Sequence, residues 1–391
     1  MVIMIKNLLL TVLLVLVVFL VPPQAAMAAI ILVGPNESIT RIADAARVAK
    51  DGDTVLIMPG EYRGDVAVWT QKHLTIRGRR ERPVLVANGK SAEGKAIWVI
   101  NNGKFLIENI EFRNARASDG NGSGVRLVRG TLHIKNCAFV DNQVGVMTAN
   151  FDDTELTVED SLFVKAPKQK DPIPHLLYVG KIAKLQVTGS RFHQGYTGHL
   201  IKSRARENNI RYNLIYDGPA GSASYELDFP HGGIAYVVGN VIGQSAKTDN
   251  RVLIAYGAEG WAWPDNILYL SHNTLLSDQI GAWFLRVWPD SFPDGIVVKG
   301  INNLTVGVGM FTQGVSGEFK ANFPALPSML NAPDMLDFTL SSNSILRGRG
   351  IDPGQSQHQD LIPRAEFKLP IGTRPIGVPL QWTPGAFQTQ P

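Results

Sequence analysis

The chain contains a single cysteine, Cys137, so no disulfide can form within it. It also has no run dense in lysine or arginine, which argues against a nucleic-acid partner. Its formal net charge is +4, or +3 without Lys6 of the N-terminal segment, and this mildly basic balance suits an anionic partner. Stability must therefore come from apolar burial, and we expect Cys137, which lies in a strand pattern, to be a small core residue.

Long apolar runs are missing except near the N-terminus. There, Lys6 precedes an apolar run over residues 8–21, and Ala26-Met27-Ala28 follows as a small-x-small cleavage site. Fourteen residues would span ~21 Å as a helix, less than the ~30 Å hydrocarbon core of a membrane. We predict a cleaved signal peptide over residues 1–28, a secreted or periplasmic location, and no stable membrane span in the mature chain.

Only one segment reads as a convincing helix. Residues 38–50 place apolar side chains along one side, with Ser38 as the expected N-cap and Asp51-Gly52 as the stop. The residues directly afterwards predict two strands joined by a turn at Pro59-Gly60. An amphipathic helix in this place can cap the first coil of a repeat protein.

A short pattern then recurs: an apolar residue, two mostly polar residues, a small residue or Asn, one more residue, and Phe, Ile or Leu. It reads IENIEF at Ile107, IKNCAF at Ile134, VEDSLF at Val158, VTGSRF at Val187, IRYNLI at Ile210, VVGNVI at Val237 and LSHNTL at Leu270. A spacing of 23 to 33 residues, with period-two alternation and many Gly and Asn residues, is typical of stacked β-coils. An earlier coil is expected at residues 74–78 and a later one at residues 296–300.

The expected fold class is therefore all-β, with a solenoid over residues 29–310. Three asparagines, Asn213, Asn240 and Asn273, occupy the same repeat position, and we predict that they form a stacked amide row at a bend. Residues 317–333 lose the repeat and read as an irregular connection. We expect residues 311–391 to form a C-terminal tail that packs along the solenoid, and the protein to be a monomer.

These coils and the opening ADAARVAKDGDTVLIMPGEY resemble the pectate-lyase-like superfamily, whose fold is a right-handed parallel β-helix. Within it, IKSRARENNIRYNLIYDG followed by PHGG looks like polysaccharide lyase family 6, the alginate lyase and chondroitinase B group. The resemblance implies that Lys202-Ser203 is the catalytic-lysine motif, that Asn208 and Asn213 are the motif asparagines, and that His231-Gly232 ends the arginine motif. Pro230 stands where that motif has its arginine.

The repeat also predicts a polar row on one outer face. Aligning one strand of four successive coils places the side chains of Lys202, Asp228, Tyr256 and Arg286 in register on the outside, with Glu226 on the same face. Earlier coils would contribute the apolar residues Val128, Ala149 and Val179. His199 and Trp283 fall in inward rows, and a surface charge ladder is the structural alternative for Lys202 and Asp228.

The resemblance implies β-elimination on a uronate-containing polysaccharide, with Lys202 as the base. The other catalytic candidates are Arg204, Tyr256, His231 and Arg286. A Ca²⁺ ion held by Asp228 and Glu226 is an alternative means of neutralising the substrate carboxylate. The predicted substrate-binding residues are Glu226, Asp228, Asn208, Tyr178, Trp288 and Glu259, and further aromatic platforms are expected at Trp261 and Trp263.

Two other functions fit the same residues. A glycoside hydrolase would use Asp228 with Glu226 or Glu259 as its two carboxyl groups. A non-catalytic carbohydrate-binding or envelope-associated solenoid would bind glycan without changing it. The product separates the three: an unsaturated sugar indicates a lyase, a new reducing end alone a hydrolase, and neither a binding protein.

Overall fold

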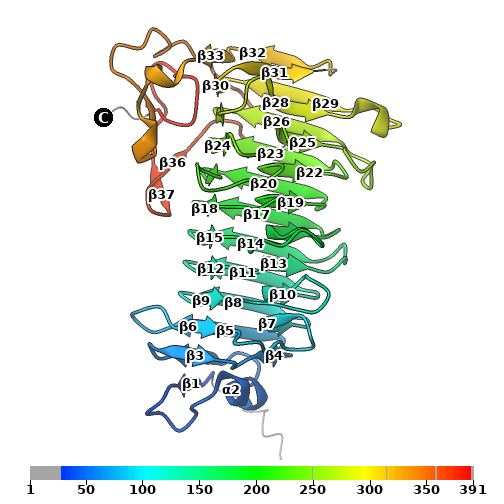
Figure 1. Cartoon of the computed structure of the whole chain (residues 1–391), viewed down its shortest axis with the longest axis vertical. Helices are drawn as coiled ribbons and strands as arrows, with labels where there is room; N and C mark the ends of the chain where they lie inside the picture. The colour runs from blue at the N-terminus through cyan, green and yellow to red at the C-terminus, as the bar shows by residue number, and fades with distance from the viewer. Residues whose placement is uncertain (1–27, 249, 314, 357–358, 389–391) are drawn as a thin grey trace, which may run out of the picture.

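The computed structural model describes residues 28–248, 250–313, 315–356 and 359–388. The predicted signal peptide lies almost wholly outside these residues. Among these residues, none of the helices has the length and apolar character of a transmembrane span. The chain winds as a parallel β-helix whose coils stack along the long axis (Figure 1).

Three parallel sheets form the walls of the solenoid, and each coil contributes one strand to each sheet in turn. Sheet A contains β1 (Ile30–Val33), β2 (Thr54–Ile57), β5 (His73–Gly78), β8 (Lys104–Glu108), β11 (Thr131–Lys135), β14 (Glu155–Glu159), β17 (Lys184–Thr188), β20 (Glu207–Arg211), β23 (Ile234–Val238), β26 (Ile267–Ser271), β29 (Val297–Ile301) and β32 (Glu318–Lys320). Sheet B contains β3 (Glu61–Arg63), β6 (Val84–Val86), β9 (Glu111–Arg113), β12 (Ala138–Val140), β15 (Leu162–Val164), β18 (Arg191–His193), β21 (Leu214–Tyr216), β24 (Val241–Gln244), β27 (Thr274–Ser277), β30 (Leu304–Val306) and β33 (Phe323–Ala325).

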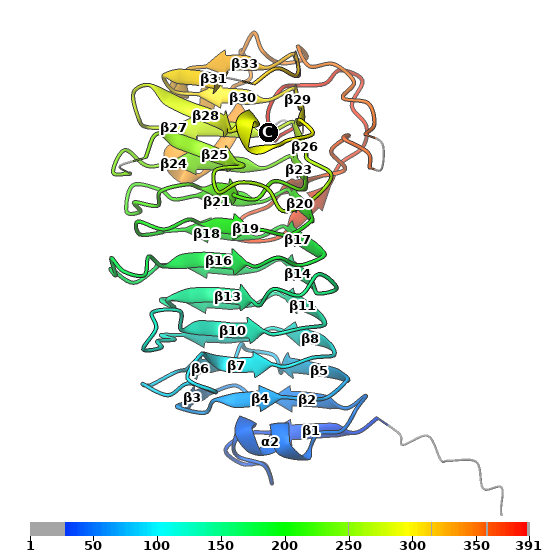
Figure 2. The same ribbon diagram turned by 90° about the vertical axis from the view of Figure 1, so that its right-hand side faces the viewer.

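Sheet C faces the viewer in Figure 2 and carries the polar row discussed below. It contains β4 (Ala67–Trp69), β7 (Ala96–Ile100), β10 (Ser123–Leu127), β13 (Val144–Thr148), β16 (His175–Val179), β19 (Ile201–Ser203), β22 (Leu227–Phe229), β25 (Val252–Tyr256), β28 (Ala282–Val287) and β31 (Gly309–Gln313). The solenoid thus continues to Ala325 in β33. It is longer than the predicted 29–310, and part of the segment 317–333, expected to be irregular, forms β32 and β33.

The recurring six-residue pattern is the corner between sheets A and B, and the strand pairing confirms its register. Its first residues pair in order, from Ile107 and Ile134 through Leu270. Its final aromatic residues stack inside the core, with ring centroids 5.2, 4.6 and 4.6 Å apart along Phe112, Phe139, Phe163 and Phe192. Parallel pairing brings equivalent side chains into one row, so a repeated apolar residue becomes a continuous core.

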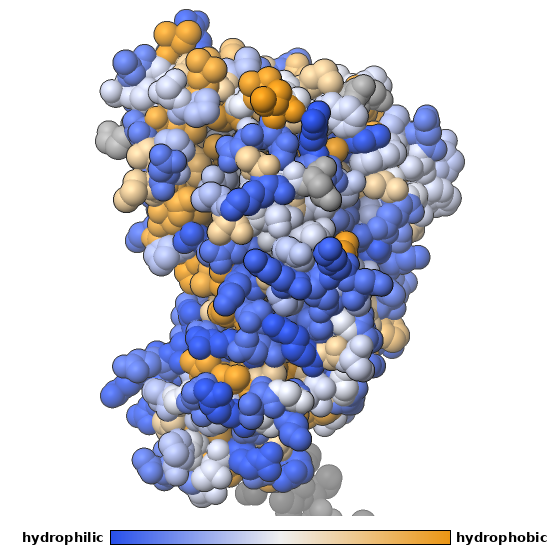
Figure 3. All heavy atoms as spheres, viewed as in Figure 1, coloured by the Kyte–Doolittle hydropathy of each residue, from blue (hydrophilic) through white to orange (hydrophobic). Residues whose placement is uncertain are grey.

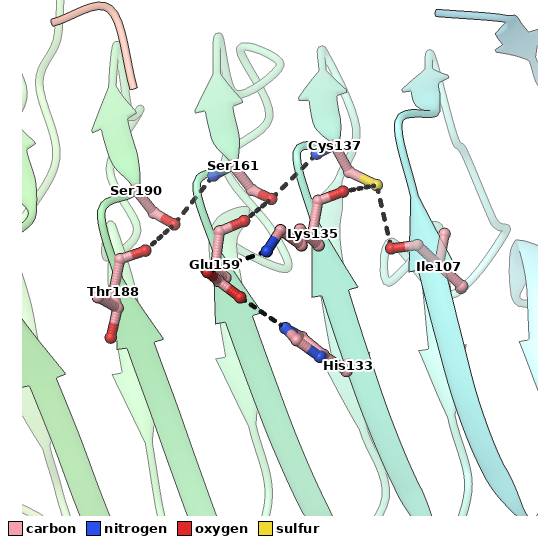
Figure 4. Close-up of polar contacts among 8 residues, drawn as sticks. All are labelled: Ile107, His133, Lys135, Cys137, Glu159, Ser161, Thr188 and Ser190. Carbon is pink, nitrogen blue, oxygen red and sulfur yellow. Dashed lines mark hydrogen bonds and ion pairs between the residues drawn. The ribbon is translucent and has the colours of Figure 1, made fainter. Parts of the chain in front are cut away.

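A hydrogen-bonded ladder runs along this corner and confirms the predicted asparagine row. The side-chain oxygen of each of Asn240, Asn273, Asn303 and Asn322 accepts the backbone N–H of the ladder asparagine one coil earlier, at 2.9–3.0 Å. Toward the N-terminus serine replaces asparagine: the Cys137 N–H donates to Ser161 and the Ser161 N–H to Ser190 (Figure 4). Cys137 itself is fully buried, as predicted. The ladder satisfies corner amides that would otherwise be buried without partners.

One short helix, α2 (Ile42–Val48), contacts β1 and β4 at the N-terminal end of the stack (Figure 1). It begins later than predicted, and Ser38 is not its N-cap. Both oxygens of Asp65, a loop residue before β4, accept the first helical amides, from Ile42 at 2.6 Å and Ala43 at 3.0 Å. A cap supplied from a distant loop leaves no local sequence signature.

The tail contains 3₁₀ turns η2 (Pro327–Met329) and η3 (Pro333–Met335) and the antiparallel pairs β34 (Leu330–Ala332)–β35 (Asp337–Leu340) and β36 (Ala365–Phe367)–β37 (Thr373–Pro375). Its apolar side chains, among them Phe338 and Phe367, pack with Leu214, Val241 and Leu304 of sheet B. Figure 3 shows hydrophobic residues along this left-hand side and hydrophilic residues over the middle of the molecule. The tail therefore leaves sheet C uncovered.

Candidate functional site

The outward row of sheet C brings the key predicted residues into register. Strand pairing aligns Tyr178 with Lys202, Lys202 with Asp228, Asp228 with Ala255, and Ala255 with Arg286. Lys202, Asp228 and Arg286 therefore share one row, as predicted. Toward the N-terminus the row continues through Met147 and Arg126, not through Val128, Ala149 and Val179.

Tyr256 does not belong to this row, and its predicted catalytic role is wrong. It pairs with Phe229, is fully buried, and its hydroxyl donates a hydrogen bond to the Gly233 carbonyl. Burial raises the pKa of this phenol well above its usual value. The predicted alignment is shifted by one residue in this coil, as it is for Val179, and a shift of one residue moves a side chain to the other face.

Glu226 also lies inside the solenoid, contrary to prediction. Its side chain is fully buried, and neither carboxyl oxygen has a hydrogen-bond partner. Two consecutive residues face the core where each of these strands begins, as Leu200 and Ile201 do one coil earlier and Leu253 and Ile254 one coil later. Inward and outward side chains do not alternate strictly at this corner. Glu226, which strict alternation places outside, therefore points inward.

Asn208 is a structural residue rather than a substrate ligand. It is fully buried in β20, its oxygen accepts the Ser203 hydroxyl at 2.6 Å, and its amide donates to the Ala205 carbonyl at 3.0 Å. These bonds hold the bend between β19 and β20. They set the direction in which the neighbouring Lys202 and Arg204 leave the sheet.

The centre of the site is an ionic cluster around Glu259. Its carboxylate accepts a hydrogen bond from Lys202 Nζ at 2.5 Å and another from Arg204 Nη2 at 2.6 Å, and His231 Nε2 lies 3.9 Å away. Lys202 Nζ also lies 3.5 Å from Asp228 Oδ2. Burial opposes ionisation, but the hydrogen bonds from the two cations lower the pKa of the Glu259 carboxyl to about 2.

Glu259 reaches this cluster because residues 257–266, the loop after β25, fold back across two coils. The Glu259 N–H donates to the Pro230 carbonyl at 2.9 Å, and Trp263 Nε1 donates to the Arg204 carbonyl at 3.0 Å. Below the loop, Gly233 has a φ of 90°, and a Cβ there would come within 3.1 Å of the Trp263 ring of the loop and 2.7 Å of the Arg206 carbonyl. The glycines of PHGG thus permit the close packing of this loop on the turn.

Asp228 connects the cluster to a group of buried rings. It is 1% exposed, and His199 Nδ1 lies 3.1 Å from its Oδ2, close but not aligned as a hydrogen bond. The His199 ring lies between those of His175 and Tyr225, at 5.0 and 4.9 Å. His199, expected in an inward row, therefore lies beside the outward row, and His175 was not among the predicted site residues.

A cavity of about 340 Å³ opens beside the cluster, lined among others by Arg126, Tyr178, Lys181, Arg204 and His231. Arg204 Nη1 donates to the Tyr178 hydroxyl at 2.5 Å. Desolvation, reinforced by Arg204, lowers the pKa of His231, so its imidazole is neutral at neutral pH. A cavity of about 440 Å³ on sheet A is lined by fewer cationic side chains. The groove on sheet C thus has the composition of a site for an anionic ligand.

Arg286 lies outside the cluster, two coils beyond Asp228 in the same row. Its guanidinium carbon is 4.6 Å from the ring centroid of Trp283 and 4.5 Å from that of Trp288. Trp283 is half-buried against Arg286 and is not the core residue that was predicted.

The predicted calcium pair is not formed. Asp228 faces outward and Glu226 lies in the core, so they cannot share an ion. Among the described residues, no group of three His, Cys, Asp or Glu side chains is placed to hold a metal ion.

Comparison with known proteins identifies the class of fold. No family model and no curated protein matches this chain. The crystal structure of pectate lyase Pel9A is similar, with a TM-score of 0.63 over 93% of this chain and 96% of that chain, at 14% sequence identity. The chain therefore has the predicted right-handed parallel β-helix fold, which this pectate lyase shares. Membership of the pectate-lyase-like superfamily stays a prediction. The narrower resemblance to polysaccharide lyase family 6 stays a prediction.

Proposed function

We propose that this protein is an exported enzyme that cleaves a uronate-containing polysaccharide by β-elimination in the groove of sheet C. The observation that supports this most directly is the position of Glu259. Lys202 and Arg204 hold its carboxylate at 2.5 and 2.6 Å on the outer face of the solenoid. Arg204, which holds this carboxylate, has the chemistry needed to bind a uronate carboxylate in its place, and Lys202 then lies beside the bound sugar.

In this mechanism the substrate carboxylate displaces Glu259 and pairs with Arg204. Its negative charge is then neutralised, which makes the C5 proton of the uronate more acidic. This step requires the unprotonated form of the Lys202 amine, which takes that proton; the C5–H electron pair forms the C4–C5 double bond, and the C4–O bond breaks. The Tyr178 hydroxyl accepts its hydrogen bond from Arg204, so its own proton is free to be donated to the leaving oxygen.

A glycoside hydrolase fits the geometry less well. Glu226 is in the core and cannot flank a glycosidic bond with Asp228. Glu259, with a pKa of about 2, is ionised at neutral pH and cannot act as a general acid. The non-catalytic alternative draws on a different observation: Lys202 Nζ is already engaged by two carboxylates, Asp228 at 3.5 Å and Glu259 at 2.5 Å.

The test is to assay the purified protein against alginate, pectate, chondroitin and dermatan, with and without a chelator. The unsaturated product is followed by its near-ultraviolet absorbance. We expect Lys202→Met to lower the elimination rate at least ~10²-fold, the usual contribution of a general base. Lys184→Met is the matched control, because Lys184 pairs with Glu207 on sheet A at 3.2 Å, away from the groove.

Wild-type elimination by Lys202→Met would rule out this mechanism. Binding of a uronate polymer without any unsaturated product would instead favour the non-catalytic solenoid.

A further inference from the structure

Arg286 is a cation of the sheet C row that takes no part in the cluster around Glu259. Three steps of strand pairing separate it from Lys202. At the usual strand spacing this places the two residues ~14 Å apart along the solenoid axis. Ala255, which lies between Asp228 and Arg286 in this row, contributes no charge.

The environment of Arg286 differs from that of Arg204. The Arg204 guanidinium binds the carboxylate of Glu259 at 2.6 Å. Arg286 forms no ion pair with any residue that the structure describes. Its guanidinium instead lies against two indole rings, with distances of 4.6 and 4.5 Å to their centroids.

Stacking of this kind orients the guanidinium but leaves its chemistry available. The indole rings cover the faces of the planar cation, whereas its N–H donors point outward from the edge of the plane. A planar fork of donors matches the two oxygens of a carboxylate. Arg286 is half-buried, so part of its side chain is open to solvent.

We propose that Arg286, held by Trp283 and Trp288, forms a second anion-binding subsite in the groove. It takes a carboxylate of the same polysaccharide chain whose other carboxylate lies at Arg204, in the coil of Lys202. This proposal rests on the proposed function and adds a requirement to it. The ligand must carry two negative charges roughly three coils apart, ~14 Å, so a single uronate or a disaccharide cannot reach both subsites.

A sulfate ester has the same charge and also presents oxygens to the fork, so the anion at Arg286 can come from either source. Oligosaccharides with carboxylates only and oligosaccharides that also carry sulfate esters separate the two. Stronger dependence of the sulfated ligands on Arg286 would assign the subsite to sulfate, and stronger dependence of the carboxylate-only ligands to uronate.

The experiment measures binding by titration calorimetry, in a Lys202→Met background that prevents turnover. The probes are uronate oligosaccharides of increasing length, from disaccharide to hexasaccharide. We expect Arg286→Gln to weaken binding of the longer oligosaccharides roughly tenfold, the effect of losing one charge-assisted pair, and to leave the disaccharide unchanged. Arg286→Lys keeps the charge without the fork and is expected to give an intermediate loss.

Arg129→Gln is the matched control. Arg129 also stacks on an aromatic ring, 5.3 Å from the centroid of Phe151, but pairs with Asp153 outside the row. Equal affinity of the Arg286→Gln and parent proteins at every length, with the disaccharide still bound, would overturn the second subsite and leave the proposed function intact. No binding of any uronate oligosaccharide would overturn the proposed function itself, and this subsite with it. Melting temperatures measured in parallel separate a folding defect from a lost contact.

Discussion

Two rows of polar side chains run along this solenoid, and they differ in what surrounds them. The ladder at the corner of sheets A and B repeats one residue type over five coils, and its asparagine amides donate to backbone carbonyls within 2.7–2.9 Å. The outward row of sheet C changes residue at each coil. There, Asp228 Oδ1 is buried without a hydrogen-bond partner, and so is Nδ1 of the adjacent His231.

The difference separates structural from functional polarity in a repeat protein. A repeated, fully paired row stabilises the coils, because each side chain satisfies backbone groups of its neighbours. A varied row with incomplete pairing adds little to stability but leaves hydrogen-bonding capacity for a ligand. Changes in the first row should therefore act on the free energy of unfolding, and changes in the second on activity and affinity.

The largest effect on stability is expected in the ladder. The side chain of Asn240 accepts from the N–H and Nδ2 of Asn213 and donates to the carbonyl of Ile210 and to Asn273. Asn240→Ala leaves several of these buried groups unpaired and should lower the free energy of unfolding by about 3 kcal/mol, measured by urea denaturation.

Ser161→Ala tests the same row at a position with fewer contacts, because Ser161 Oγ makes only two hydrogen bonds. We expect it to lower the free energy of unfolding by about 1 kcal/mol. Neither change should alter the activity of the folded protein. A loss of activity without a loss of stability would contradict the distinction between the rows.

Glu226 provides a test inside the core. Burial raises the pKa of its carboxyl well above the usual value, and the nearby negative charge of Asp217 raises it further. As the pH rises above ~4.3 the unfolded chain ionises this group while the folded chain keeps it protonated, so stability falls. Glu226→Leu should remove this loss and raise stability by roughly 1–3 kcal/mol at pH 8, with a smaller gain at pH 4.

Thermal melts at the two pH values check this prediction, with Glu155→Leu on the exposed face of sheet A as the control. Some pH dependence of the same sign should remain, because burial also raises the pKa of Asp217 to about 6. A variant that is less stable than the parent at pH 8 would show that Glu226 is ionised and paired in solution.

The smallest effect is expected at Glu259. If its carboxylate occupies the place of a substrate carboxylate, Glu259→Gln should bind uronate oligosaccharides a few times more tightly, a gain of about 1 kcal/mol. Because the pKa of Glu259 is about 2, the group is ionised from pH 5 to 9 and the gain should be constant over that range. Titration calorimetry in the Lys202→Met background measures it.

Glu318→Gln is the control, since Glu318 pairs with Lys299 and Lys320 on sheet A. Weaker binding by Glu259→Gln would mean that this carboxylate organises the two cations and does not compete with the substrate.

The sequence was sufficient for the coils because they repeat. Apolar anchors, corner asparagines and glycines recur at similar spacing, and parallel stacking converts that spacing directly into register. The same logic placed Lys202, Asp228 and Arg286 in one row, although it misassigned Tyr256 by one residue.

The errors in the site arise where the structure departs from the repeat. Glu226 points inward because two successive residues face the core at the start of the strand. Glu259 joins Lys202 across 57 positions of sequence through a folded-back loop. No repeat encodes the path of such a loop, so its acid was predicted as a candidate but not as the partner of Lys202 and Arg204.

The burial of Cys137 has a consequence for how the protein withstands oxidants. Its sulfur lies in the core of the ladder, and burial raises the pKa of the thiol to about 12. A thiol that is neither ionised nor accessible reacts slowly with oxidants and with other thiols. Two folded copies are therefore slow to cross-link through sulfur, and the native chain resists oxidation at this position.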